Sequence, residues 1–131
     1  MAPPRGASGV AVPTDAEIRV LASSGQYGTL AAAYRARMGA VTILSADELR
    51  FTADAALRMS DFQTASHALK RIGYDHSTSP HAPDALLQGG ILIGRELRRP
   101  ADGQKLLRHL IQSYPQSPAA EQARRLLGVT Q

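Results

Sequence analysis

With 131 residues, the chain has room for one compact domain or for about three helical hairpins, and its net charge of +4 makes it basic. Aromatic residues make up 5% of the chain and Trp is absent, so Ala and Leu carry most of the apolar content, which favours close helix packing over a β-sandwich. The lack of cysteine excludes disulfides and thiolate metal sites, and no apolar run approaches the ~20 residues that a membrane-spanning helix needs.

The N-terminal segment differs in composition from the rest of the chain. Residues 1–13, MAPPRGASGVAVP, contain Pro, Gly, Ala and Ser and little that could be buried, which predicts a disordered arm or linker. Residues 14–131 are expected to form the folded domain. The N-terminus lacks the apolar stretch of a signal peptide, and a cytoplasmic and a periplasmic location are both compatible with the sequence.

Signals for helix starts recur along the folded part. A Ser or Thr followed three residues later by Glu or Gln is a capping box, and a proline after Ser suits the first helical position. These signals occur at Thr14 with Glu17, Ser45 with Glu48, Ser60 with Gln63, and Ser117 with Pro118. Together with the apolar spacing they predict helices at 15–24, 27–38, 46–59, 61–74, 83–97, 101–114 and 118–128. The predicted fold class is therefore all-α.

The chain also resembles itself at an offset of 38 residues. This offset superimposes Ala65 on Gly103, Leu69 on Leu107, Ile72 on Leu110, and Ser79–Pro80 on Ser117–Pro118. The spacing of the first three positions is i, i+4, i+7, which is one stripe of a helix, and the small leading residue allows a neighbouring helix to approach closely. A more degenerate copy lies at residues 25–34, which match residues 60–69 at an offset of 35.

This pattern resembles the second helix of a tetratricopeptide repeat, in which a small residue, a large residue and a proline follow at fixed spacing. The corresponding first-helix packing positions are Leu49, Thr52, Ala53 and Ala56 in one copy, and Leu87, Gly90, Ile91 and Gly94 in the next, with Pro115 at the terminal proline. The repeat is four residues longer than the family's 34, it lacks the first-helix Trp and Tyr, and Ser77 replaces one proline. The closing stretch HLIQSYPQSPAAEQARRLL is similar to repeats of bacterial cell-envelope proteins.

The resemblance implies about three hairpins stacked as a short right-handed superhelix, with the last helix covering the end. In that family the first helices line a concave groove that takes a protein ligand. Carried over by position, the groove residues of this chain would be Asp47, Arg50, Asp54, Arg58, Gln88, Leu92, Arg95 and Glu96. Such a mixed-charge groove would suit an extended peptide or a chain terminus. Alternating charges four residues apart are equally typical of a solvated, salt-bridged helix face.

No residue pattern indicates catalysis, a cofactor or a metal. His76, His81 and Asp84 are the one cluster to weigh as metal ligands, but a turn that contains proline is normally polar and solvated. Ser66–His67 and His76–Ser77 are adjacent pairs that point in different directions on a helix or turn. The glycines at 89, 90 and 94 lack the Lys-Ser/Thr of a phosphate-binding loop and lie in a helical pattern, so close helix packing explains them better.

Two functions of different classes follow. The first is a non-catalytic scaffold that binds a protein or peptide partner, as a domain of a larger envelope protein or complex. The alternative is a nucleic-acid or anionic-surface binder that uses the Arg excess. Base stacking needs exposed aromatic rings, but Tyr34, Phe51 and Phe62 fall on helices expected to pack, which weakens this alternative. Self-association into a homo-oligomer through the open ends of the stack is a further expectation.

Overall fold

The computed structural model describes residues 17, 20–21, 23–36 and 44–128. These residues form helices and turns, with no strand among them, which confirms the all-α class. The helices are α2 (Tyr27–Ala36), α3 (Ala46–Arg58), α4 (Phe62–Asp75), α5 (Ala82–Arg95), α6 (Pro100–Ser113) and α7 (Pro118–Leu127). The predicted arm at 1–13 and the Thr14 cap lie outside the described residues. Of the helix predicted at 15–24, residues 17, 20–21 and 23 are described and helical.

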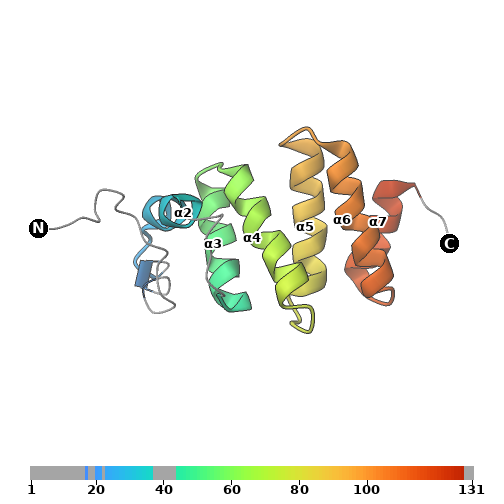
Figure 1. The fold of residues 1–131 in the computed structure, drawn as a ribbon, viewed down its shortest axis with the longest axis horizontal. Coiled ribbons are helices and arrows are strands. Elements are labelled where there is room, and N and C mark those ends of the chain that lie inside the picture. The colour runs from blue at the N-terminus through green and yellow to red at the C-terminus, as the bar shows by residue number, and fades with distance from the viewer. Residues whose placement is uncertain (1–16, 18–19, 22, 37–43, 129–131) are drawn as a thin grey trace, which may run out of the picture.

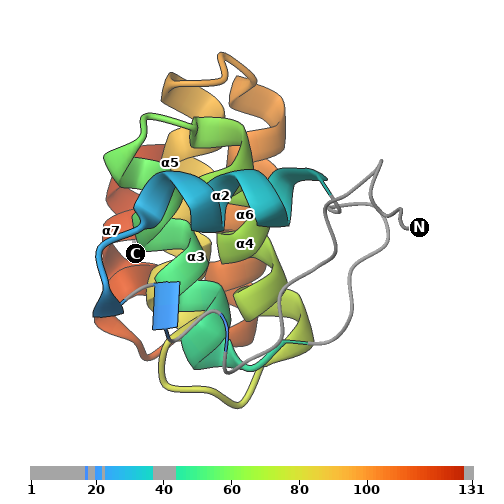
Figure 2. The same ribbon diagram turned by 90° about the vertical axis from the view of Figure 1, so that its left-hand side faces the viewer.

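Helices α3 to α7 lie side by side in chain order, with each helix antiparallel to the one before (Figure 1). Short connections between consecutive helices account for this order. Helix α7 contacts both α6 and α5 at the end of the row. Helix α2 is different: it appears end-on in Figure 1 and runs across α3 and α4 in Figure 2. The degenerate copy at residues 25–34 therefore does not continue the row as an equivalent upright helix.

The core consists of two large apolar clusters that meet at α5. The first contains Leu30, Tyr34, Leu49, Leu69 and Ile72 together with buried alanines, and the second contains Leu86, Leu106, Leu107 and Leu110 with the alanines of α7. All positions of the 38-residue stripe are buried, from Ala65 and Leu69 to their counterparts Gly103 and Leu107. Of the first-helix packing positions, Ile91 and Gly94 are half-buried and the others are buried.

The repeat is also present in the backbone. Helices α4 and α6 have 14 residues each and begin at Phe62 and Pro100, 38 positions apart. The loop before each contains a non-glycine residue in the left-handed region, Ser60 with φ 56° and Arg98 with φ 57°, again 38 apart. Left-handed backbone costs an L-residue roughly 1–2 kcal/mol and is uncommon, so its recurrence at equivalent positions indicates a common loop geometry.

The helix caps follow the sequence signals with one correction. Ser45 and Ser117 accept hydrogen bonds from the backbone N–H of Glu48 and Ala120, as predicted. Ser60 does not cap α4. Its left-handed backbone shifts the helix start by one residue, and Asp61 caps instead, with its carboxylate accepting from the backbone N–H of Thr64 at 3.2 Å and from its hydroxyl at 2.7 Å. Each of the two carboxylate oxygens of Asp61 thus accepts one of the two donors of Thr64.

Glycine sets the separation of α5 and α6. A Cβ atom at Gly103 would lie 2.6 Å from the carbonyl oxygen of Gly90 and 2.9 Å from the amide nitrogen of Gly94. Both atoms belong to the α5 backbone, which cannot move aside as a flexible side chain could. The predicted role of these glycines in close helix packing is confirmed at this contact.

Candidate functional site

A cavity of about 660 Å³ lies against the exposed face of α3. It is lined by Val20, Ser23, Tyr27, Asp47, Phe51, Asp54 and Arg58. The four α3 residues are spaced at i, i+4, i+7 and i+11, so they form one stripe along the helix. The stripe faces away from the core because the intervening residues Leu49, Thr52, Ala53 and Ala56 are buried.

Local sequence explains why α3 presents this stripe. Ser45 caps the first turn, and Asp47 in that turn interacts favourably with the positive end of the helix dipole. Arg58 lies in the last turn, where a cation is favourable. Its guanidinium carbon lies 4.5 Å from the centre of the Tyr27 ring, a cation–π contact that ties the end of α3 to the start of α2.

The cavity combines apolar and acidic surface. Phe51 is 37% exposed and Val20 is 60% exposed, so both present apolar area to solvent. Phe51 lies on a helix that was expected to pack, but it belongs to the surface stripe, because the buried face of α3 is formed by residues such as Leu49 and Thr52. Asp54 has no hydrogen-bond or ion-pair partner among the described residues.

Asp47 and Arg50 both contact His81, which lies just before α5. The Arg50 Nη1 atom is 3.1 Å from His81 Nδ1, and His81 Nε2 is 3.2 Å from the Asp47 Oδ1 atom. Since a guanidinium can only donate, Nδ1 is the acceptor and Nε2 carries the proton that is donated to Asp47. This bridge connects α3 with the start of α5 along the row.

The eight residues predicted to line one groove separate into several places. Asp47, Asp54 and Arg58 line the cavity on α3, whereas Arg50 and Gln88 line a smaller cavity of about 50 Å³ with His81 and Asp84. Leu92 is half-buried against the core. Arg95 and Glu96 are exposed at the C-terminal end of α5.

The cavity is also lined by residues that were not predicted from the sequence: Val20, Ser23, Tyr27 and Phe51. Phe51 could have been found, because it lies four residues after Asp47 and three before Asp54. Val20 and Ser23 precede α2, and Tyr27 is its first residue. They reach the cavity because α2 runs crosswise, and no sequence pattern indicates that course.

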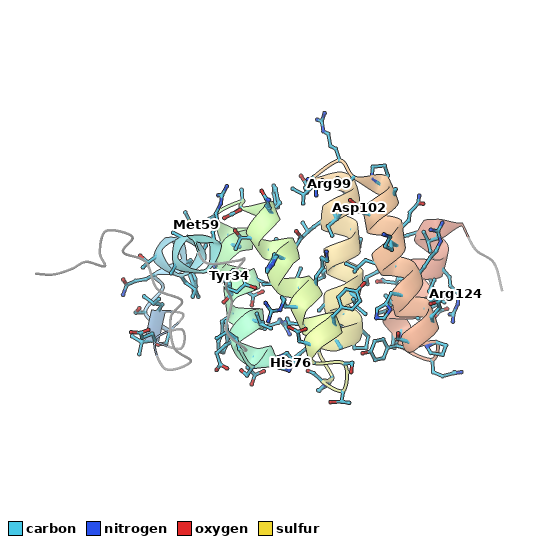
Figure 3. The ribbon with its side chains drawn as sticks, in the orientation of Figure 1. Tyr34, Met59, His76, Arg99, Asp102 and Arg124 are labelled. Atoms are coloured by element: carbon cyan, nitrogen blue, oxygen red, sulfur yellow. The ribbon has the colours of Figure 1, made fainter. Side chains whose placement is uncertain are left out.

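The histidines make structural contacts. His76 lies at the end of α4 (Figure 3). It donates from Nε2 to the Leu44 carbonyl oxygen at 2.6 Å and so joins the end of α4 to the segment that leads into α3. Across the residues described by the structure, no group of three or more His, Asp or Glu side chains is placed to hold a metal ion. Ser66 donates to the Gln63 carbonyl while His67 contacts the Tyr34 hydroxyl, so this adjacent pair does not form a dyad.

No protein-family model matches the chain, and no curated protein matches it in sequence. In the described part of the chain, no helix is both long enough and apolar enough to cross a bilayer.

Proposed function

We propose that this chain is a non-catalytic protein-interaction domain of the tetratricopeptide kind, which binds an extended segment of a partner protein at the cavity on α3. The observation that carries the proposal is this cavity, in which exposed aromatic and aliphatic surface adjoins the unpaired carboxylate of Asp54. Its volume of about 660 Å³ falls in the range of roughly 300–1,000 Å³ that is common for ligand pockets.

The repeat supports the assignment to tetratricopeptide-like hairpins in a right-handed superhelix. The 38-residue offset is carried by the buried stripe, by the helix lengths and by the left-handed loop residues Ser60 and Arg98. Hairpins with one apolar face are stable when they stack, and stacking leaves the first helix of each hairpin with a surface available to a ligand. Helix α3 is the first helix of its hairpin, and the cavity lies on it.

The charges of the cavity indicate the chemistry of the partner segment. Among the described lining residues, Asp47 and Asp54 supply two carboxylates and Arg58 supplies one cation, which is already engaged with the Tyr27 ring. A segment with an apolar side chain for Phe51 and Val20 and an adjacent Lys or Arg for Asp54 is complementary. A terminal carboxylate suits the cavity less well, because Arg50 and Arg95 are not among its lining residues.

The proposal is tested with a library of short peptides and the purified domain. We expect selection of peptides that contain a basic residue next to an apolar one. Phe51→Ala and Asp54→Asn should each weaken binding about tenfold, since a buried aromatic anchor or a charged hydrogen bond contributes roughly 1.5–3 kcal/mol. Leu126→Ala, which removes an exposed apolar side chain on α7 outside the cavity, is the control and should leave the affinity unchanged.

The alternative function, nucleic-acid or anionic-surface binding through the Arg excess, predicts a different salt dependence. Phosphate-driven binding falls steeply with added salt, whereas an apolar anchor is comparatively insensitive. A result in which the domain retains oligonucleotides at low salt and selects no peptide would favour this alternative. Equal affinity of the wild type, Phe51→Ala and Asp54→Asn for the selected peptides would refute the cavity on α3 as the binding site.

A further inference from the structure

A second cavity, of about 300 Å³, lies between α4 and α6 near the C-terminal end of α5. It is lined by Gln63, Ser66, His67, Lys70, Tyr74, Ile93, Leu97, Arg99, Asp102, Lys105 and Leu106. None of these residues lines the cavity on α3. Arg99 and Asp102 lie at the edge of the row where α5 connects to α6 (Figure 3).

Positive charge is concentrated in this cavity. The chain contains two lysines, Lys70 and Lys105, and both line it together with Arg99. Within the described part of the chain, none of these three side chains forms an ion pair or a hydrogen bond. Several other cations are engaged: Arg35 pairs with Asp61, and Arg125 pairs with Glu121. Among the described lining residues Asp102 is the single carboxylate, so these residues carry a net charge of +2.

His67 adds a donor to the same cavity. Its Nδ1 atom lies 3.0 Å from the hydroxyl oxygen of Tyr34, which is buried and 1% exposed. Burial raises the pKa of Tyr34 to about 12, so the phenol keeps its proton at neutral pH. No other acceptor for that proton is found among the described residues, and the hydroxyl therefore donates to Nδ1. The imidazole proton then lies on Nε2.

The remaining lining is apolar. Tyr74 is 46% exposed, and its ring is held by the ring of His109 at a centroid distance of 4.7 Å. Ile93, Leu97 and Leu106 complete this side of the cavity. An aromatic ring that is fixed but exposed offers a stacking surface at low entropic cost.

From these features we infer that the cavity between α4 and α6 binds a phosphate monoester carried on an aromatic group. A phosphate monoester has a charge of about −1.5 to −2 at neutral pH and three acceptor oxygens, which complements the three cations and the net charge of the lining. The first turn of α6 begins beside Arg99, and the positive end of its dipole adds to the same field. The aromatic group of the ligand would contact Tyr74 and the leucines.

The test uses phenyl phosphate as the probe and follows backbone amide shifts of the ¹⁵N-labelled domain. Shifts confined to residues 63–74 and 93–106 support the inference. Lys70→Met and Lys105→Met should each weaken binding about tenfold, because each removes a charged hydrogen bond. Arg108→Met is the matched control, since it removes an exposed cation of the same α6 helix that does not line the cavity.

Three results would overturn the inference. One is the absence of shifts in those two segments at millimolar phenyl phosphate. Another is an equal loss of affinity in Arg108→Met, which would indicate unspecific attraction to the positive surface. The third is equal binding of benzoate, which carries a single charge and would show that a phosphate is not required.

Further probes define the ligand. Binding of inorganic phosphate at least tenfold weaker than phenyl phosphate supports the aromatic part of the inference, and equal binding overturns that part. A peptide that contains phosphotyrosine distinguishes two sources of the same chemistry. Tighter binding of the peptide supports a phosphorylated protein as the source, whereas binding equal to phenyl phosphate supports a free aromatic phosphate.

Discussion

Tyr34 and His67 form a polar contact inside an otherwise apolar region of the molecule. Their rings meet edge-on at a centroid distance of 5.7 Å, and the hydroxyl and Nδ1 atoms satisfy each other. The contact lies between α2 and α4, which are otherwise joined by the exposed Arg35–Asp61 pair. A buried hydroxyl without a partner costs roughly 1–3 kcal/mol, so this contact helps to fix the crosswise position of α2.

His67 is expected to make folding dependent on pH. Burial lowers the pKa of its imidazole below the ordinary 6.5, and the charges of Arg71 and Lys70 lower it further, while Asp75 opposes them. As the pH falls below 6.5, the unfolded chain takes up a proton at this position that the folded chain resists. The free energy of unfolding should therefore be constant above that pH and decrease below it, until the folded-state pKa is reached.

This pH dependence is measured by urea unfolding between pH 8 and pH 5 in the wild type and in His67→Gln. The carboxylates titrate in both proteins, so the difference between the two curves isolates the imidazole. We expect the wild type to lose more stability toward pH 5 than the variant. Parallel curves would contradict a lowered His67 pKa.

Between elements, the most restrictive contact is the crossing of α5 and α6 at Gly90, Gly94 and Gly103. The equivalent position in the crossing of α3 and α4 is Ala65, which is fully buried and carries a Cβ atom. The crossing of α5 and α6 has no room for that methyl group, because a Cβ atom at Gly103 would meet the α5 backbone.

Gly103→Ala should destabilise the domain by about 1–3 kcal/mol, because the new Cβ would meet α5 backbone atoms and force the helices apart. Gly94→Ala is the matched control on the facing helix, since its Cβ would meet no atom within 4 Å. That substitution should stabilise by roughly 0.5–1 kcal/mol through the higher helix propensity of Ala. Thermal unfolding of the two variants measures both effects. Changes in stability of the same sign in the two variants would contradict the packing described for this crossing.

For the whole molecule, the row of helices depends on the cover at its end. Helix α7 buries Ala119, Ala120 and Ala123 against the cluster that contains Leu110, and its start is fixed by the Ser117 cap. Its outer face carries the exposed polar residues Glu121, Gln122 and Arg125 together with the exposed Leu126. An alanine face toward the core and a mainly polar outer face suit a helix at the end of a row.

Deleting residues 117–131 should therefore lower stability and cause self-association, because the apolar surface around Leu110 would be exposed. Ser117→Ala provides a graded version, with an expected loss of about 1 kcal/mol and no change in oligomeric state. Chemical unfolding and size-exclusion chromatography measure the two properties. A deletion variant as stable as the wild type would show that α7 is dispensable for the core.

The sequence alone determined the number, type and approximate limits of the helices after residue 44, because capping residues and the i, i+4, i+7 spacing are local signals. It also determined the 38-residue repeat. The glycines on α5 and α6 indicated that these two helices approach closely, since glycine has no side chain to hold them apart. Tertiary structure decided the rest. The crosswise course of α2, the exposure of Phe51 and the division of the predicted groove residues between two cavities depend on helix orientations. Those orientations result from the packing of side chains distant in sequence, such as Tyr34 against His67, and no local pattern encodes them.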